Sequence, residues 1–252
     1  ELNFDYVIPG EDETPNGAIE TLKDAKICAD LFNKNNKKID GIIVILPNFG
    51  DELGVVNTLK LSGLKVPVLV QACNDDINSV DIYGRRDAFC GKISVCNNLY
   101  QYKIPFTDTS LHTCDINSDT FKKDLNDFSN ICRIVKGIRE MRIGAIGTRP
   151  AAFQTVRFSE KILQANGITV VPVDLSEILG NTEKIDNNAD DVVKKIERIK
   201  NYGNIPDYVK EKNIVKQAKL SVAIDNWMAE NELDASAVQC WESIEYNYGC
   251  AT

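Results

Sequence analysis

Three polar residues, Thr148, Arg149 and Asp174, come directly after short apolar segments of the chain. Residues 143–146 and 168–173 have the composition of strands buried on both faces, and a helical pattern separates them. Strands joined through a helix form a parallel crossover, and ligands of parallel sheets bind beyond the carboxyl ends of the strands. The spacing therefore predicts that these side chains lie at the rim of a binding site. A cap or an ion pair is the alternative role for Arg149.

Residue type and spacing argue against several other kinds of chemistry. The chain has one histidine, His112, which alone cannot supply the ligand count of a usual metal site. Instead of a metal ligand, His112 is interpreted as a loop or interface residue. The eight cysteines contain no C-x-x-C pair, which excludes zinc ribbons and thioredoxin-type sites, and we expect reduced thiols. Residues 146–152 (IGTRPAA) lack the glycine fingerprint of a nucleotide-dependent dehydrogenase.

Composition narrows the class of protein further. The 252 residues are 43% hydrophobic and 26% charged, which is typical of a soluble globular protein. A formal net charge of -8 argues against nucleic acid or a membrane surface as a partner, and no apolar run approaches the roughly 20 residues of a membrane span. The chain begins at Glu1, without an initiator methionine or a signal peptide. We therefore expect residues to be missing upstream and a cytoplasmic location.

The elements that would position a site alternate between strand and helix patterns in the first part of the chain. Expected strands are 4–8, 40–46 and 67–72, and expected helices are 18–33, 55–64 and 121–140. The stretch 73–115 is polar and aromatic-rich with weak periodicity, so we expect it to be irregular and functional or part of an interface. Residues 1–140 are predicted to form one α/β domain with a parallel sheet.

Residues 141–252 predict a second domain of the same kind. Its expected elements are a strand 143–146, a helix from Phe153 that closes at 165–167, a strand 168–173, a polar hairpin-like stretch after Ile178, helices 189–200 and 206–233, and a last strand 237–240. The predicted fold class is α/β, with two consecutive Rossmann-like parallel-sheet domains. Because the chain stops at Thr252 directly after the last strand and a short segment, we expect the second domain to be incomplete at its carboxyl terminus.

Four stretches resemble the L-fucose isomerase and L-arabinose isomerase family, over the amino-terminal two domains of those enzymes. They are 42–50 (IIVILPNFG), 67–71 (PVLVQ), 143–178, which ends in VDLSEI, and 237–241 (AVQCW). Each stretch is short, so the resemblance depends on their order along nearly the whole chain.

The resemblance implies interconversion of a ketose and an aldose sugar by a homo-oligomer. In the family a divalent metal, typically Mn²⁺, chelates adjacent sugar oxygens while two carboxylates move protons through an enediol. The family's metal ligands lie beyond the end of this sequence. We therefore expect no catalytic residue, metal ligand or cofactor in this chain, no isomerase activity from it alone, and Mn²⁺ in the full-length protein.

The position of Arg149 in the turn after a strand makes it a candidate substrate-binding residue, and the resemblance adds five more: Asn48, Phe49, Gln239, Trp241 and Glu242. The segment that contains Phe49 resembles one whose aromatic residue reaches the sugar site of a neighbouring subunit. Plainer roles stay open for several of them: a turn at Asn48, interface filling by Phe49, a core aromatic at Trp241, and a solvated face for Glu242 with Glu245.

Two further alternatives concern a charged cluster and the function as a whole. Arg85, Arg86 and Asp87 are interpreted as a surface ion-pair cluster, with a subunit contact as the alternative. The alternative function is a non-catalytic module whose two lobes close on a small sugar. The missing signal peptide and the cysteines in apolar surroundings count against that module.

Overall fold

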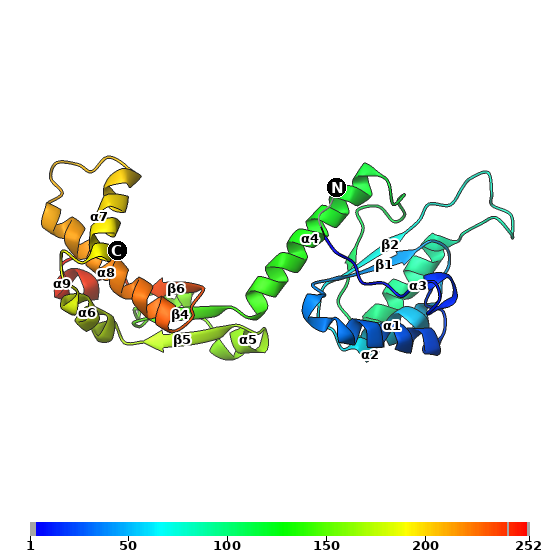
Figure 1. Cartoon of the computed structure of the whole chain (residues 1–252), viewed down its shortest axis with the longest axis horizontal. Coiled ribbons are helices and arrows are strands. Elements are labelled where there is room, and N and C mark those ends of the chain that lie inside the picture. Colours follow the sequence, from blue (N-terminus) through cyan, green and yellow to red (C-terminus); the bar gives the residue numbers. More distant parts are fainter. Residues whose placement is uncertain (1–3, 241, 251–252) are drawn as a thin grey trace. The chain divides into compact units, whose positions relative to one another are not determined.

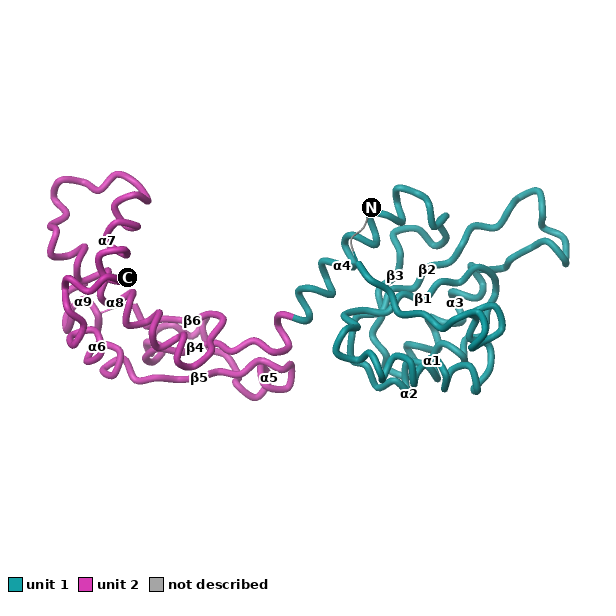
Figure 2. Tube along the Cα trace, in the orientation of Figure 1, with its two compact units in different colours: residues 1–136 teal, residues 137–252 magenta. Residues whose placement is uncertain are grey.

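The computed structural model describes residues 4–240 and 242–250 and divides the chain into two compact units, Glu1–Lys136 and Gly137–Thr252 (Figures 1 and 2). Each unit contains a three-stranded, fully parallel sheet with helices between the strands. The predicted fold class, α/β with two consecutive Rossmann-like parallel-sheet domains, is therefore confirmed. The domain boundary predicted at residue 140 and the division at residue 136 both fall in or at the end of one long helix, α4 (Asp119–Arg139).

The sheet of the first unit has the spatial order β1-β2-β3, which follows the chain: β1 (Ile42–Leu46), β2 (Val68–Ala72) and β3 (Thr107–Asp108). Val44 lies opposite Val70, and Leu69 lies opposite Thr107. All five residues of β2 are buried, as expected for the central strand of a sheet that is covered on both faces.

Helices cover both faces of this sheet. On one face Ile42 and Val70 pack with Val56 of α2 (Glu52–Ser62) and Leu99 of α3 (Ala88–Gln101), while α1 (Leu22–Lys34) packs against α2. On the other face Leu69 packs with Phe128 and Cys132 of α4. Two short 3₁₀ turns complete the unit: η1 (Pro15–Gly17) and η2 (Asn36–Lys38). Alternate strand residues therefore enter two separate hydrophobic cores.

Side chains determine where the helices of the first unit begin. Thr21 and Asp24 form a reciprocal capping box at the start of α1. Hydrogen bonds from the side chain and backbone of Thr21 hold the pKa of the Asp24 carboxyl below its usual value. Asp51 caps α2 by accepting a hydrogen bond from the Gly54 amide, and Gly63 ends this helix in the left-handed conformation with φ of 63°.

The sheet of the second unit has the order β5-β4-β6, so the first strand along the chain is central: β4 (Arg142–Ile146), β5 (Thr169–Val173) and β6 (Ala235–Val238). Gly144 lies opposite Val171 on one side and Ser236 on the other. The chain leaves β4 first to one side and later to the other. This reversal of strand order is a topological switch point.

The core of the second unit lies between its sheet and the helices that follow β5. Ile146 packs with Ile178 of α6 (Leu175–Lys184) and with Trp227 of α8 (Glu211–Glu230). A Cβ at Gly144 would lie 2.5 Å from Cζ3 of Trp227, so the glycine permits this approach. The other helical elements are η3 (Gln154–Val156), α5 (Glu160–Ala165), α7 (Asp190–Tyr202) and α9 (Ser243–Asn247).

Two predictions about the first unit are wrong. Residues 4–8 were expected to form a strand, but they pair with no strand, and Tyr6 is 82% exposed. A short apolar run becomes a strand only where a neighbour accepts its hydrogen bonds. The stretch 73–115 was expected to be irregular, but it contains α3 and β3. Lys92 and Asn98 occupy buried positions of α3, which obscures the apolar period.

Two helix predictions in the second unit also need correction. The helix expected from Phe153 to its close at 165–167 ends as expected but begins only at Glu160, because Ser159 provides the N-cap by accepting a hydrogen bond from the Ile162 amide. The stretch expected to resemble a hairpin after Ile178 is instead the body of α6, which Asp174 caps and whose Ile178 and Thr182 are buried. Within the described ranges, no helix is long and apolar enough to cross a membrane.

Candidate functional site

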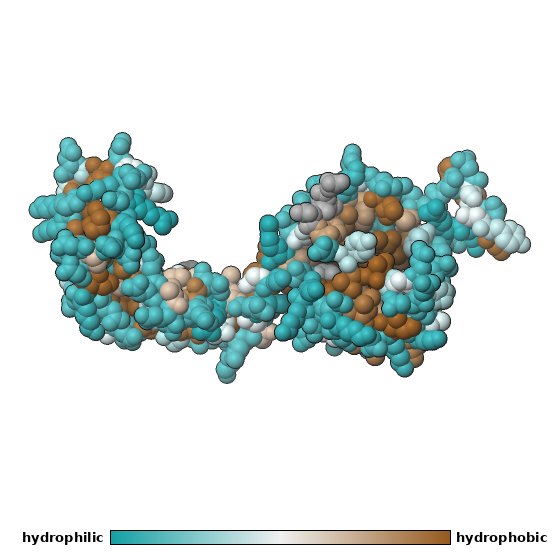
Figure 3. Space-filling view, in the orientation of Figure 1, coloured by the Kyte–Doolittle hydropathy of each residue, from teal (hydrophilic) through white to brown (hydrophobic). Residues whose placement is uncertain are grey.

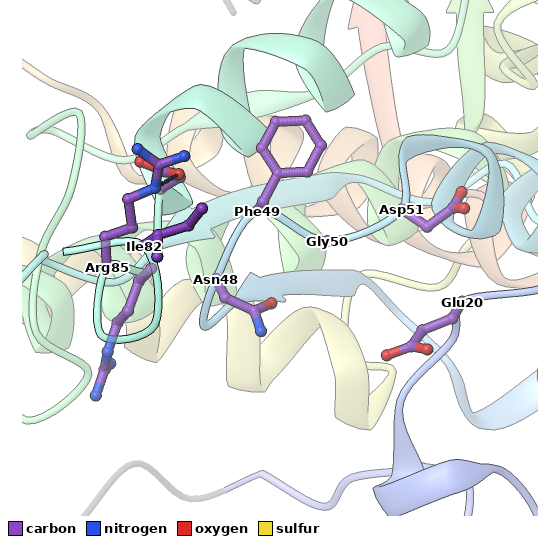
Figure 4. A pocket seen from close by; sticks show the side chains of 9 residues that line it. Glu20, Asn48, Phe49, Gly50, Asp51, Ile82 and Arg85 are labelled. Carbon is purple, nitrogen blue, oxygen red and sulfur yellow. Dashed lines mark ion pairs between the residues drawn. The ribbon is translucent and has the colours of Figure 1, made fainter. Parts of the chain in front are cut away.

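The loops that follow β1 and β2 enclose a shallow hollow of about 510 Å³ in the first unit (Figure 4). Its lining combines one aromatic ring, one amide and five charged side chains: Glu20, Asn48, Phe49, Gly50, Asp51, Ile82, Arg85, Arg86 and Asp87. The predicted site residues Asn48 and Phe49 are adjacent in the sequence, and their side chains point in opposite directions in Figure 4. Both lie directly beyond the carboxyl end of β1. This is where ligands of parallel sheets bind.

The position of Phe49 depends on a glycine of α3. A Cβ at Gly91 would overlap the backbone carbonyl oxygen of Phe49, so no other residue type allows the loop to lie this close to the helix. Phe49 is 49% exposed. Its ring is therefore held at the surface by a backbone contact and keeps part of its face available to a ligand.

The long loop between β2 and α3 is closed at its base by Asp75, whose Oδ1 accepts hydrogen bonds from the amides of Arg86 (2.8 Å) and Asp87 (3.0 Å). Asp87 has a left-handed φ of 53°, which is strained for a residue other than glycine, and its carboxylate pairs with Nε of Arg85 at 2.9 Å. The predicted ion pair within this cluster is confirmed for Arg85 and Asp87. Its alternative role as a subunit contact stays a prediction.

The same loop projects from the first unit and carries apolar side chains at its surface (Figures 1 and 3). They are Ile77, Val80, Ile82 and Tyr83, with exposed fractions of 64% to 97%. Large apolar side chains that gather on one exposed loop are typical of a contact surface.

The charged groups of the hollow differ in whether other residues form hydrogen bonds or ion pairs with them. Arg85 pairs with Asp87, and Asp51 caps α2. By contrast, no hydrogen bond or ion pair joins the Arg86 guanidinium or the Glu20 carboxylate to any residue that the structure describes. In Figure 4, Arg85 lies at one end of the hollow and Glu20 at the other.

A buried cation supports the neighbouring edge of the sheet. The Nζ of Lys92, a residue that is 2% exposed, donates hydrogen bonds to Thr109 Oγ1 (2.6 Å) and to the His112 carbonyl (3.0 Å), and it pairs with Asp108. His112 is exposed, and its ring lies 5.1 Å from that of Phe89. Lys92 thus ties α3 to the loop that follows β3.

In the second unit, the loop after β4 meets the loop after β6. The Thr148 amide donates a 2.8 Å hydrogen bond to Oε1 of Gln239, one of the predicted site residues. Gly147, with φ of 76°, has no side chain, and the Gln239 side chain occupies the space that a Cβ at this position would take. Gln239 Nε2 lies 3.5 Å from Ser243 Oγ. The side chain therefore joins the two loops.

The two charged residues predicted at this rim contact their own segments. Arg149 donates from Nη1 to the carbonyls of Pro150, Ala151 and Phe153, at 2.8 to 3.2 Å. The Asp174 carboxylate accepts from the amide and hydroxyl of Ser176, which holds its pKa below the usual value. These bonds correspond to the capping alternative for Arg149. Its predicted contact with substrate stays a prediction.

The remaining predicted site residues follow β6. Glu242 is exposed, with φ of 53°, and directly precedes α9, while Glu245 is also exposed. Trp241 lies outside the described residues. The structure thus places Asn48 and Phe49 together in the first unit, and Arg149, Gln239 and Glu242 in the second unit. The substrate-binding role of each remains a prediction.

The described residues do not fit a metal centre. Across residues 4–240 and 242–250, no three His, Cys, Asp or Glu side chains gather closely enough to hold an ion. All eight cysteines are free, and burial raises the pKa of the Cys28 and Cys96 thiols to about 11.

Sequence reasoning missed part of the hollow. It identified Asn48 and Phe49 but not Glu20, which belongs to the segment before α1, and it interpreted Arg86 only as part of a surface cluster. One signal was present in the sequence, since Gly91 interrupts the pattern of α3 at the position that contacts the Phe49 backbone.

Comparison with known proteins agrees with the resemblance. The family model of the fucose/sulfoquinovose isomerase N-terminal domain matches residues 1–139. The chain is also 25% identical over 215 residues to the sulfoquinovose isomerases of Priestia aryabhattai and Priestia megaterium. That alignment covers 85% of this chain but only 46% of each relative, so the chain spans about half the length of the curated relatives that it matches. More than half of its residues match the family model, and the chain belongs to the fucose/sulfoquinovose isomerase family.

Proposed function

We propose that this chain is the amino-terminal region of a metal-dependent ketose–aldose sugar isomerase, where it contributes substrate recognition and oligomer contacts. The observation that carries the proposal is the hollow beyond β1, in which Phe49 and Asn48 lie between groups of opposite charge. The family membership of residues 1–139 supports an isomerase.

The composition of the hollow suits a sugar. An aromatic ring such as Phe49 packs against the apolar C–H face of a sugar ring. The Asn48 amide both donates and accepts hydrogen bonds, and the Glu20 carboxylate accepts them from hydroxyl groups. Sulfoquinovose, the sugar in the name of both relatives, has hydroxyl groups as well as a sulfonate, and we propose a substrate of this general class.

The catalytic metal, Mn²⁺ by family resemblance, is proposed to be held by parts of the full-length protein outside these residues. A divalent ion bound to adjacent sugar oxygens would stabilise the charge that develops on an enediolate. The residues of this chain bind and orient the sugar and supply no ligand to the ion. On this proposal the chain alone has no isomerase activity.

Oligomer contacts are proposed for the projecting loop between β2 and α3. Its exposed Ile77, Val80 and Tyr83 are large apolar residues that a neighbouring subunit would cover. Because Ile82 of the same loop also lines the hollow, such a contact would place a neighbouring subunit beside the bound sugar. We propose a homo-oligomer in a reducing, cytoplasmic environment, which the eight free cysteines support.

The test combines binding with activity. Titration calorimetry of the chain with aldoses and ketoses measures affinity, and Phe49→Ala is expected to weaken binding about fivefold. Phe158→Ala, at a 59% exposed phenylalanine of the second unit, is the matched control. Isomerisation is then measured with Mn²⁺ on the chain and on a version extended to the length of its relatives.

The proposal expects activity only in the extended version and a loss of sugar affinity only in Phe49→Ala. If the extended version is inactive while the chain still binds sugars, a non-catalytic binding module replaces the isomerase. If no sugar binds and neither version is active, the assignment of sugar recognition to this chain is wrong.

A further inference from the structure

Strand β1 lies at the edge of its sheet but has the composition of an interior strand. The order β1-β2-β3 gives it β2 as its neighbour on one side. Its residues, Ile42–Leu46, are all aliphatic, and Ile45 is 52% exposed. Edge strands of natural sheets are usually protected from further pairing by a charge, a proline or a bulge. β1 contains neither a charge nor a proline, and its register with β2 is unbroken, so its outer edge is open to another strand.

The backbone groups at this outer edge follow from the pairing with β2. The Ile42 amide donates a 2.9 Å hydrogen bond to the Pro67 carbonyl, on the side of β2. Because alternate residues of a strand direct their backbone groups to the same neighbour, Ile43 and Ile45 direct theirs away from β2. The amides and carbonyls of these two residues have no hydrogen-bond partner in the part of the chain that the structure describes.

The same unit contains a second strand-like segment without a partner, residues 4–8 (FDYVI). No hydrogen bond joins this segment to any residue within 4–240 and 242–250. Its alternate side chains Phe4, Tyr6 and Ile8 are 48%, 82% and 64% exposed. Free backbone groups, with a large apolar side chain at every second position, are the features by which an extended segment adds to the edge of a sheet.

The charges beside the two segments are complementary. The acids Glu11 and Asp12 follow residues 4–8, and the cations Lys37 and Lys38 precede β1. All four side chains are exposed, and none has an ion-pair partner among the described residues. An antiparallel pairing would bring the acids beside the lysines, whereas a parallel pairing would bring them to the loop after β1, which contains an acid of its own. Charge complementarity therefore favours the antiparallel direction.

We propose that residues 4–8 of one copy of this chain pair antiparallel with β1 of a second copy, which receives the same segment in return. Within one copy the two segments do not pair, and a two-fold axis permits the exchange because each copy offers both surfaces. With Ile8 opposite Ile42, the exposed Tyr6 would lie opposite the half-buried Val44 and cover it. The proposal goes beyond the proposed function, since it concerns residues outside the projecting loop and requires no sugar.

The experiment is sedimentation velocity of the whole chain without sugar, from about 1 to 100 µM. We expect a monomer–dimer equilibrium with a dissociation constant on the order of 10 µM, because two short strand pairs form a small interface. In this register the Val7 amide bonds to β1, so Val7→Pro should raise the dissociation constant about tenfold, and Val7→Ala, which keeps the amide, less than about threefold. Added salt should weaken the dimer, because it screens the exposed charges.

Three further measurements locate the contact. Ile45→Lys, which places a charge on the open edge, should raise the dissociation constant about tenfold. Ile134→Lys, at a 56% exposed isoleucine of α4, is the matched control and should leave it unchanged. A peptide of residues 4–13 (FDYVIPGEDE) in excess should convert dimer to monomer, and a scrambled peptide should not. Hydrogen exchange of the Ile43 and Ile45 amides should slow as the dimer forms.

A monomer at every concentration would overturn the proposal, as would equal losses in Ile45→Lys and Ile134→Lys. A dimer that Tyr83→Lys weakens and Ile45→Lys does not would assign the contact to the projecting loop instead. Protection of the Ile43 and Ile45 amides in a monomeric version extended to the length of the relatives would show that another strand of the longer protein covers β1, and would also overturn the exchange. Each of these results leaves the proposed sugar recognition standing, because no sugar is present in the assay.

Discussion

The two sheets of this chain are both parallel and three-stranded, but they differ in strand order and in what the polar groups beyond their strands do. The second unit has the switch point beside β4, where a binding crevice is expected, and the first unit has no reversal of strand order. The hollow with unbalanced charges nevertheless lies in the first unit. At the edge of the second unit, Gln239 bonds the Thr148 amide and Arg149 bonds the carbonyls of its own loop.

The difference shows that strand order alone does not determine which sheet edge has side chains available to bind a ligand. At the second edge Gln239 and Nη1 of Arg149 replace missing backbone partners, so these two side chains help to hold the loops. At the first edge Gly91 lets the loop after β1 lie against α3, Lys92 holds the loop after β3, and Asp75 closes the loop between β2 and α3. The side chains at the surface, Arg86 and Glu20, are thereby left available.

The largest effect is expected from Gly91→Ala. The new Cβ would overlap the backbone of Phe49, which cannot move aside as a flexible side chain does, so we expect a loss of about 3 kcal/mol in the free energy of unfolding of the first unit. Urea unfolding followed by circular dichroism measures this loss. Both tryptophans, Trp227 and Trp241, belong to the second unit, so tryptophan fluorescence separates the unfolding of that unit.

Two further glycines calibrate this result. Gly147→Ala in the second unit would meet only the Gln239 side chain but has a φ of 76°, so we expect a smaller loss, about 1–2 kcal/mol, seen in the fluorescence transition. Gly180→Ala, in α6 with open space around it, should stabilise by about 0.5–1 kcal/mol. Equal losses for Gly91→Ala and Gly180→Ala would show that α3 does not support Phe49 by close contact.

The second effect is expected from Lys92→Met. This change leaves Thr109, Asp108 and the His112 carbonyl without their shared donor, and Asp108 is about half exposed, so we expect a loss of about 2 kcal/mol. Hydrogen exchange should increase in residues 108–112. Lys123→Met, which removes an exposed pair with Asp127, should cost less than about 0.5 kcal/mol. A similar small loss for Lys92→Met would contradict its supporting role.

Much of the fold followed from residue patterns. The strands β1, β2, β4 and β5 could be recognised by their continuous apolar runs. The expected burial on both faces holds only for β2 among these four, since β5 has two exposed residues and no buried one. The position of Asn48 and Phe49 beyond β1 followed from the same pattern, since a parallel sheet places such loops at the ligand edge. Local apolar composition was therefore sufficient to predict most strands of both sheets and the part of the hollow that follows β1.

The rest depended on contacts between distant segments. β3 has two residues, Thr107 and Asp108, and is a strand only because β2 lies beside it. Glu20 reaches the hollow from a segment that precedes α1, and no spacing in the sequence links it to Asn48. Arg149 and Arg86 both belong to polar turns, and only their hydrogen bonds distinguish a donor that the protein uses from one that it does not.

A third, smaller effect is expected from Arg149→Gln. The loss of bonds to the carbonyls of Pro150, Ala151 and Phe153 should loosen the exposed loop at a cost of less than about 1 kcal/mol. Hydrogen exchange of residues 147–157 measures this change. Because the guanidinium already has three acceptors, we expect sugar affinity to change less than it does in Arg86→Gln. A larger loss of affinity in Arg149→Gln would reverse the comparison between the two edges.

The smallest expected effect is a change in the reaction rate of one exposed cysteine at each of the two sheet edges. Cys90 lies on α3 beside Gly91, Cys240 follows Gln239 in the second unit, and both are exposed. Iodoacetamide at pH 8 should therefore modify these two first, as followed by peptide mass spectrometry. Burial raises the pKa of Cys28 and Cys96 to about 11, so only about one such thiol in a thousand is ionised at pH 8, and their rates should rise as the pH approaches 11.

A bound sugar then distinguishes the two edges in one sample. A ligand in the hollow lies close to the first turns of α3, so a saturating sugar should slow the modification of Cys90 about twofold to threefold and leave Cys240 unchanged. Protection of Cys240 alone would move recognition to the edge of the second unit, where Arg149 and Gln239 lie. Protection of Cys90 alone, lost in Phe49→Ala, would mean that an edge without a switch point binds the ligand because its side chains are not needed to hold its own loops.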